Sequence, residues 1–370
     1  MKKQYDYIII GGGLIGLSIA FGLSKNGRKC LILDDEDNNF RAARGNFGLI
    51  WVQGKGSGFP AYADWTNRSY ELWSDFSLEL EDLSGIKLGT EQKGGIHVCL
   101  TEDEYQKRKH KLEILRNHQN GKFNFEMLDN KSLSKIIPGI GENVFGGSYS
   151  EYDGHVNPLY LMKALHNSFE QNKGIFLSNS KVLNVVKTGN DFCVKTKDHK
   201  FLSHRLILSA GLTNKYLAPM VGLNQPVRPV KGQILVTEKV DNFISLPTTV
   251  LRQTKEGSLM IGDSHEELGM DVSSDPKIMS KIANRAVETF PKLSKVQIIR
   301  SWAALRVMSP DGLPIYDQSN VCPGCFAISC HSGVTLAAAH ANDLANYIDN
   351  GNLGEELNTF SGKRFDVSKN

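Results

Sequence analysis

The stretch that decides the fold is residues 1–35, MKKQYDYIIIGGGLIGLSIAFGLSKNGRKCLILDD. Residues 7–10 form a short run of β-favouring side chains, which predicts a buried strand. Apolar residues then recur at helical spacing over 14–25, and residues 30–33 are apolar again. A strand, a glycine turn, a helix and a second strand in this order predict one βαβ unit.

The glycines between the first strand and the helix follow G-x-G-x-x-G spacing at Gly11, Gly13 and Gly16. Gly11 permits a tight turn, Gly13 lets a pyrophosphate approach the backbone, and Gly16 lets the helix lie close to the strand. The helix N-terminus supplies unpaired N–H groups and a partial positive charge. Asp34 follows about 20 residues later, where an acid can accept hydrogen bonds from ribose hydroxyls. The stretch therefore predicts a dinucleotide site, although the motif alone does not choose between FAD and NAD.

The same residues could instead be a secretion signal or a membrane anchor, because two lysines precede a long apolar run. Asp6 and the clustered glycines interrupt that run, and no stretch reaches the ~18 uninterrupted apolar residues of a spanning helix. A net charge of +3 without a concentrated basic block gives no case for nucleic-acid binding. Six scattered cysteines favour reduced thiols. We therefore expect a cytoplasmic protein without a transmembrane segment.

The remainder of the chain contains few helical crossovers. Residues 35–60 are glycine-rich with little periodicity, which is typical of a functional loop. Helices are predicted over 70–83, 101–117, 158–170, 278–290 and 334–347, and strands over 94–100, 233–238, 248–253, 258–263 and 327–329, with three more within 181–211. This pattern predicts an α/β (α+β) protein in which a nucleotide-binding domain is interrupted by a second, sheet-rich domain.

Seven stretches carry a resemblance when they are taken together and in order. They are DYIIIGGGLIGLSIAFGL, DGHVNPLYLMKAL, LILSAG, VKGQILV, IGDSHEELGMD, SWAALRVMSPDGLPI and HSGVTLAAAHANDLANYI. Over nearly the whole chain the set resembles the FAD-dependent D-amino-acid oxidase (DAO) family, which includes glycine oxidase, sarcosine oxidase and D-amino-acid dehydrogenases. RGNFGLIWVQGKG and CPGCFAISCHSGVTLAAAHA are most similar to the FAD β subunits of opine oxidase and D-hydroxyproline dehydrogenase complexes.

The resemblance implies a Rossmann-like FAD-binding domain of the glutathione-reductase type, interrupted by a β-sheet-rich substrate domain. The FAD-binding domain is expected over 1–88, 150–215 and 300–370, and the substrate-binding domain over 89–149 and 216–299. One type of sarcosine oxidase attaches its flavin to a cysteine that would fall between Ser301 and Asp311, where this chain has none. Non-covalent FAD is therefore expected.

The resemblance also assigns roles to individual positions. The expected cofactor contacts are Gly11, Gly13, Gly16, Asp34, Ala43, Arg44, Asn46, Gly48, Val182, Ala210, Gly211, Arg306, Ser332, Gly333, Val334 and Thr335. Positions 43–48 match the loop beside the flavin ring, Val182 matches a backbone contact to adenine, and 331–335 match the turn near the flavin pyrimidine edge. Arg306 matches the residue that holds the substrate carboxylate in glycine oxidase-like enzymes. Arg306 and His331 are the expected catalytic residues, and no metal site is expected.

The implied chemistry is oxidation of a C–N bond. Removing the α-hydrogen with its electron pair needs an acceptor that no side chain provides and a flavin does. The planar fork of Arg306 suits a carboxylate, and the N-terminus of a helix starting at Val334 would stabilise negative charge on reduced flavin. The expected substrate is a D-amino acid, glycine, sarcosine, D-hydroxyproline or an opine, and the imine product would hydrolyse to a keto acid.

Other interpretations of the sequence remain open. The chain could be an FAD- or NAD-linked reductase of another class, although a single G-x-G-x-x-G unit argues against one holding both cofactors. It could also be a subunit that passes electrons to partner subunits, including a [2Fe-2S] protein, or that associates peripherally with a membrane. Cys322-x-x-Cys325 with Cys330 is interpreted as an incidental turn, and a redox pair, a partner contact or a metal site completed by another chain is the alternative.

Overall fold

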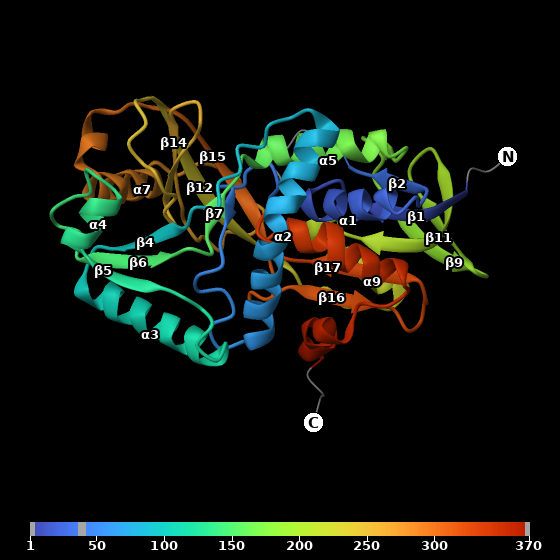
Figure 1. The fold of residues 1–370 in the computed structure, drawn as a ribbon. Coiled ribbons are helices and arrows are strands. Elements are labelled where there is room, and N and C mark those ends of the chain that lie inside the picture. The colour runs from blue at the N-terminus through green and yellow to red at the C-terminus, as the bar shows by residue number, and fades with distance from the viewer. Residues whose placement is uncertain (1–3, 36–41, 367–370) are drawn as a thin grey trace.

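The central feature of the protein is an eight-stranded sheet (Figure 1). The computed structural model describes residues 4–35 and 42–366. The strand order is β16-β17-β11-β1-β2-β8, with β10 paired to β11 and β9 paired to β10. The path from β17 to β8 is parallel, whereas β16, β10 and β9 are antiparallel to their neighbours. The strands are β1 (Gln4–Ile10), β2 (Cys30–Leu33), β8 (Ile175–Leu177), β9 (Asn184–Thr188), β10 (Asp191–Lys195), β11 (Lys200–Leu208), β16 (Ile315–Gln318) and β17 (Cys325–Ser329).

Both faces of this sheet are buried, which explains the unbroken apolar run in β1. Tyr7 and Ile9 pack into a cluster with the helices on one face, while Ile8 and Ile10 pack into a second cluster on the other. The helices of the first face are α1 (Leu14–Lys25), α2 (Pro60–Ser84), α5 (Pro158–Gln171), and a C-terminal run of α8 (Ala337–Ala339), the π-helical turn η4 (His340–Leu344) and α9 (Ala345–Asp349). Short helices α6 (Asn214–Leu217) and η2 (Ala218–Val221) cover the second face.

A second lobe consists of smaller antiparallel sheets (Figure 1). One sheet has the order β13-β14-β12-β15 and another the order β4-β6-β5. Their bounds are β13 (Leu251–Gln253), β14 (Ser258–Ile261), β12 (Arg228–Lys239), β15 (Ile298–Met308), β4 (Gly95–Cys99), β6 (Gly146–Ser150) and β5 (Glu126–Asp129). Helices α3 (Glu102–His118), α4 (Asn130–Ile136) and α7 (Pro276–Thr289) belong to this lobe. One apolar cluster, which includes Ile96, Leu235 and Phe290, joins the two sheets into one core.

The remaining elements are short. The ribbon of β3 (Leu49–Ile50) and β7 (Gly154–His155) is the third small sheet. The 3-10 helices are η1 (Gly211–Thr213), η3 (Pro291–Lys295), η5 (Glu355–Phe360) and η6 (Gly362–Phe365).

The predicted α/β fold, with a Rossmann-like parallel sheet and a sheet-rich second part, is confirmed. Helix α1 and strand β2 have the predicted bounds. Caps explain two other helix starts: the Thr101 hydroxyl accepts from Glu104 N at 3.2 Å, and Asn157 caps α5 ahead of Pro158.

Several predicted boundaries were wrong, and the structure gives a physical reason for three of them. Helix α2 begins at Pro60, ten residues before the predicted start at 70, because proline is well suited to the first helical turn. The strand predicted over 248–253 is shortened to β13, because Thr248 accepts from Leu251 N and forms a turn. The last helix begins at Ala337 rather than Val334, because residues 333–336 form turns.

The domain boundaries stay a prediction. Strand β15 crosses the expected boundary at 299/300, and β12 pairs with it from Ile298 to Met308. Among the described residues, no helix is both long enough and apolar enough to cross a bilayer.

Candidate active site

The glycine turn joins β1 to α1. Gly11 has φ +108°, and a Cβ there would lie 2.5 Å from Ser209 O. A Cβ on Gly16 would lie 1.9 Å from Gly11 O, so the helix approaches the strand too closely for any side chain. Gly13 is the residue before α1, and a Cβ there would meet only the Ala43 side chain, at 3.9 Å. Gly11 and Gly16 thus shape the turn, and Gly13 leaves space beside the helix N-terminus.

That space is a cavity of about 680 Å³, which we call the dinucleotide cleft. The predicted residues Gly13, Asp34, Ala43, Arg44 and Asn46 line it. Its further lining residues are Gly12, Leu17, Asn157, Pro158, Leu159, Met162, Lys163, His166, Phe176, Ser178, Arg252, Thr254, Met260, Arg300 and Trp302. The cleft therefore combines a helix N-terminus, several cationic side chains and apolar walls, as a bound dinucleotide requires.

A second cavity of about 210 Å³ adjoins the first, and we call it the inner pocket. Asn46 lines both cavities. The predicted residues Arg306, His331, Ser332, Val334 and Thr335 line the inner pocket together with Asn46. Its further lining residues are Ala42, Gly45, Phe47, Leu49, Trp51, Lys55, Gly232, Ile234, Thr249, Asp263, Ala304, Leu305, Val307 and Cys330.

Seven predicted cofactor residues line neither cavity: Gly11, Gly16, Gly48, Val182, Ala210, Gly211 and Gly333. Gly48 has φ +90°, and its N–H donates to Asn46 Oδ1 at 2.7 Å, so it orients the residue shared by both cavities. Val182 is buried in the apolar cluster behind the sheet. Ala210 N donates to Asn214 Oδ1 at 2.9 Å. The cofactor roles of these positions stay a prediction.

The turn that carries His331 is fixed from two sides. The Thr335 carbonyl accepts from Ser69 Oγ at 2.7 Å and from Trp73 Nε1 at 2.9 Å, both on α2. The Thr335 hydroxyl accepts from Trp51 N at 3.2 Å. These bonds hold the turn against α2 and against the loop of Trp51, which also lines the inner pocket.

His331 is partly buried, and its Nδ1 has no hydrogen-bond partner among the described residues. Burial and the nearby cations Lys55 and Arg306 hold the pKa of His331 well below its usual range. The ring is therefore neutral at physiological pH and can accept or donate one hydrogen bond inside the pocket.

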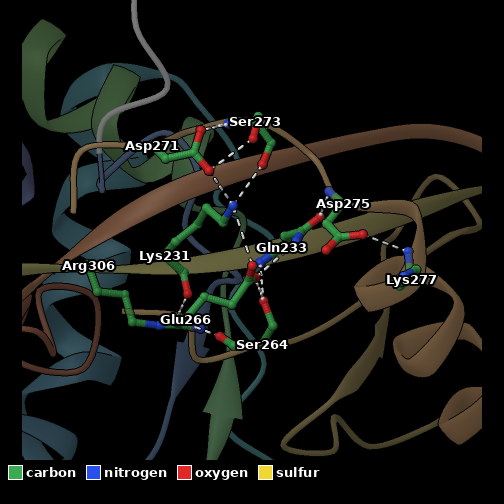
Figure 2. Close-up of polar contacts among 9 residues, drawn as sticks. All are labelled: Lys231, Gln233, Ser264, Glu266, Asp271, Ser273, Asp275, Lys277 and Arg306. Carbon is green, nitrogen blue, oxygen red and sulfur yellow. Dashed lines mark hydrogen bonds and ion pairs between the residues drawn. The ribbon is translucent and has the colours of Figure 1, made fainter. Parts of the chain in front are cut away.

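Arg306 lies on β15, and its guanidinium is already engaged (Figure 2). Nη1 donates to Ser264 O at 2.8 Å and to Lys231 O at 3.2 Å, and Nη2 forms an ion pair with Asp263. These contacts use three of the five N–H groups of an arginine. The sequence prediction assigned this guanidinium to a substrate carboxylate and did not foresee Asp263. A substrate carboxylate would have to use the remaining N–H groups or displace Asp263.

A buried lysine, Lys231, holds the loop that carries Glu266 and Asp271 (Figure 2). Lys231 is 1% exposed, and its Nζ lies 2.7 Å from Asp271 Oδ2 and 3.4 Å from Glu266 Oε2. Burial lowers the pKa of Lys231, but the hydrogen bonds to Asp271 and Glu266 outweigh burial and raise it. Gln233 extends this network by donating to Glu266 at 2.9 Å and accepting from Asp275 N at 2.9 Å. The segment 263–275 is thereby tied to β12 beside Arg306.

Lys55 is the pocket cation that sequence reasoning missed. It lies between Gly54 (φ +81°) and Gly56 (φ +68°), so the chain reverses around it. Its Nζ donates to Ser332 Oγ at 2.8 Å, and that hydroxyl is also 2.7 Å from Tyr62 OH. Burial lowers the pKa of Lys55 to about 8. The only sequence signal was its place in the glycine-rich loop over 35–60.

The loop before Lys55 is held by a buried acid. Asp153 Oδ1 accepts from Val52 N at 2.6 Å and from Gln53 N at 3.1 Å. Burial raises the pKa of Asp153 to about 6. Arg108 donates to the Gln53 side chain and completes this network. Lys55 thus follows a loop segment that is hydrogen-bonded to Asp153 and Arg108.

The cysteines of the C-x-x-C turn are unpaired thiols. Cys325 is buried on β17, Cys322 is partly exposed, and neither lines a cavity described above. Burial raises the pKa of Cys330, which lines the inner pocket, to about 12. Within the described part of the chain, no group of three or more His, Cys, Asp or Glu side chains could hold a metal ion.

The fold and the paired cavities define a dinucleotide-binding oxidoreductase. The family described as "FAD dependent oxidoreductase" (DAO) matches residues 6–347. The chain belongs to this family and is an FAD-dependent enzyme that acts on the C–N bonds of amino-acid-like substrates.

Relatives cover the chain from end to end. It is 44% identical over 363 residues to the B subunit of opine oxidase from Agrobacterium tumefaciens (strain Ach5), covering 98% of both chains. It is 42% identical over 367 residues to the B subunit of opine oxidase from Rhizobium meliloti, covering 99% of both. The fold matches glycine oxidase from Geobacillus kaustophilus with a TM-score of 0.90 at 21% identity, over 97% of this chain and 98% of that chain.

The residues of this chain fit FAD. The open space beside Gly13 and the N-terminus of α1 suit a pyrophosphate, and Asp34 lines the same cleft. His331 lines a pocket that meets this cleft at Asn46, and its buried Nδ1 has no hydrogen-bond partner among the described residues. The cleft residues would hold the ADP half of the cofactor, and the residues at the junction would face its ring.

Proposed function

We propose that this chain oxidises the C–N bond of a small amino or imino acid, and that it does so as the flavoprotein subunit of a larger dehydrogenase. The observation that carries the proposal is the meeting of the dinucleotide cleft and the inner pocket at Asn46, with Arg306 and His331 in the pocket wall. A substrate in the inner pocket would therefore lie next to the cofactor, which is the arrangement that hydride transfer needs.

The residues of the pocket can divide the work of positioning. FAD, when bound, supplies the hydride acceptor. Arg306 would bind the substrate carboxylate through the N–H groups that Ser264, Lys231 and Asp263 leave over. The neutral His331 ring would hydrogen-bond the substrate or the cofactor without adding charge. Trp51 and Val334 line the pocket and would exclude water from the reacting carbon.

The test is an anaerobic titration of the purified yellow protein with glycine, sarcosine, D-proline, D-hydroxyproline and an opine. We expect at least one of these acids to bleach the flavin. We expect Arg306→Gln to lower the affinity of the protein for that acid. Arg28→Gln is the matched control, because Arg28 forms a surface ion pair with Asp349 and lines neither cavity. If none of the acids bleaches the flavin, the proposal is wrong.

A role within a multi-subunit enzyme is supported by the two opine oxidase relatives, both of them B subunits, which match this chain over nearly their whole length. Electrons would then leave the reduced flavin for a partner, for which a [2Fe-2S] protein is one candidate. We expect the isolated chain to reduce an artificial dye rapidly and oxygen slowly. Rapid peroxide formation by the chain alone would contradict this part of the proposal.

A further inference from the structure

The inner pocket has an excess of positive charge. Its charged lining residues are two cations, Lys55 and Arg306, and one acid, Asp263. Asp263 forms an ion pair with Arg306, so among the described residues the charge left without a direct acidic partner is that of Lys55. His331 adds no charge to the pocket because it is neutral at physiological pH.

The groups that face Lys55 are neutral. Its hydrogen-bond acceptor is the Ser332 hydroxyl, which is shared with Tyr62. Burial raises the pKa values of the Tyr62 hydroxyl and the Cys330 thiol, so both stay uncharged near pH 7. Two further charges affect the pKa of Lys55 in opposite directions: Lys111 lowers it, and Asp153 raises it. Asp153 itself is occupied by the N–H groups of Val52 and Gln53.

Lys55 and Arg306 come from different parts of the chain and line the same pocket as His331. The charges of both lower the pKa of His331, so both lie within electrostatic reach of that ring. Lys55 is fixed by the reversal at Gly54 and Gly56 and by the loop anchored to Asp153. Burying a cation among neutral groups without an anion is costly, so a cation held in this way favours the approach of an anion.

We propose that Lys55 and Arg306 bind two separate carboxylates of one substrate, so that the site is built for an amino or imino acid with two carboxylate groups. This inference rests on the proposed function, because it takes the inner pocket as the substrate site. It gives Lys55 a binding role. It also leaves Arg306 only one carboxylate to bind, so part of the Arg306 guanidinium can stay paired with Asp263. One carboxylate would orient the carbon to be oxidised, and the other would select the substrate.

The test uses ether analogues, which have no amine to oxidise. Diglycolate carries two carboxylates and methoxyacetate carries one, and their dissociation constants for the FAD-loaded protein are measured by calorimetry. We expect diglycolate to bind at least about tenfold more tightly than methoxyacetate. We expect Lys55→Met to remove this preference, because an uncharged side chain cannot form an ion pair with the second carboxylate. Methoxyacetate has no second carboxylate, so its binding should change less than about twofold. D-2-hydroxyglutarate carries both carboxylates on one carbon chain, as an acidic amino acid does, whereas diglycolate carries them on either side of an ether oxygen, as an imino diacid carries them on either side of its nitrogen. The tighter binder of the two therefore shows which kind of substrate the pocket fits.

Two variants serve as controls. Lys55→Arg keeps the positive charge and should keep most of the preference. Lys111→Met removes a neighbouring lysine that lines neither cavity and should leave both ligands unchanged. Equal binding of the two ethers to the wild type would overturn the proposal, as would a preference that survives in Lys55→Met.

Failure of this inference is distinguishable from failure of the proposed function. If amino acids with one carboxylate bleach the flavin and the two ethers bind equally, the function stands and the role of Lys55 is wrong. If no amine bleaches the flavin and neither ether binds, the inner pocket is not the substrate site and both fail.

Discussion

Gly16→Ala and Gly13→Ala each add one methyl group to the same turn, and the structure predicts opposite consequences. The Cβ of Gly16→Ala would lie 1.9 Å from Gly11 O, whereas real Cβ contacts essentially never fall under 3.0 Å. Strand and helix would therefore have to separate by at least about 1 Å, and overpacking of this kind costs roughly 3 kcal/mol or more when the obstacle is backbone. We expect Gly16→Ala to lose both stability and FAD.

Gly13→Ala should fold normally and bind FAD poorly. Gly13 has φ −79° and ψ −176°, which alanine adopts without strain, and its nearest obstacle is 3.9 Å away. The free energy of unfolding should stay the same or rise by up to about 1 kcal/mol, because alanine restricts the unfolded chain. The new methyl group would project into the dinucleotide cleft, where the pyrophosphate needs close contact with the backbone, so FAD affinity should fall by at least about tenfold.

The two effects are separated by urea unfolding of the apoprotein and by titrating the apoprotein with FAD while following quenching of flavin fluorescence. FAD binding by Gly13→Ala that is as tight as in the wild type would contradict the role given to Gly13. Unfolding of Gly16→Ala at the wild-type urea concentration would contradict the close packing of helix and strand at Gly16.

Four further outcomes follow from the site. Because the pKa of Asp153 rises from 3.8 to about 6 on folding, its stabilising contribution is complete below pH 3.8 and is lost by pH 6. The loss is about 3 kcal/mol at 1.36 kcal/mol per pKa unit, and Asp153→Asn should lack this slope when unfolding is measured between pH 4 and 7. Arg306→Lys should lower kcat/KM for anaerobic flavin reduction by at least about 100-fold, because a lysine cannot pair with a carboxylate bidentately; an unchanged value would contradict its role. The diglycolate affinity should be constant below pH 7 and fall above pH 8 as Lys55 loses its proton, and calorimetry on Lys55→Arg should show no such fall. Cys322→Ser should leave the rate of flavin reduction unchanged, and a slower rate would contradict the interpretation of the C-x-x-C turn as incidental.

The sequence predicted the dinucleotide-binding half of the protein best. Helix α1 has its predicted bounds because the glycines, the apolar period and the following Asn26 all mark the same element. Asp34 lies in the cleft because its place at the end of β2 is fixed by the strand itself. Such local signals need no knowledge of the rest of the chain.

The wall of the inner pocket could not be predicted in the same way. Lys55 is one lysine in a glycine-rich loop, and that loop is held by residues far away in the sequence, among them Asp153, about a hundred residues later. The ion pair between Arg306 and Asp263 depends on how the segment after β14 folds back over β12. Tertiary contacts of this kind leave no periodic trace in the sequence.

The hydrogen bonds from Ser69 and Trp73 to the Thr335 carbonyl join residues that are 266 and 262 positions apart in the sequence. All segments of the second lobe lie between these residues in the sequence. The N-terminal and C-terminal parts of the chain are thus joined directly, while strand β11 from the segment between them lies between β1 and β17 and completes the same sheet. The segments that build the second lobe could therefore be exchanged or reshaped, and with them the acid that is oxidised, while these contacts and β11 preserve the eight-stranded sheet beside the cofactor cleft. A chimaera that carries the second-lobe segments of a glycine oxidase in place of its own should remain yellow and acquire a new substrate.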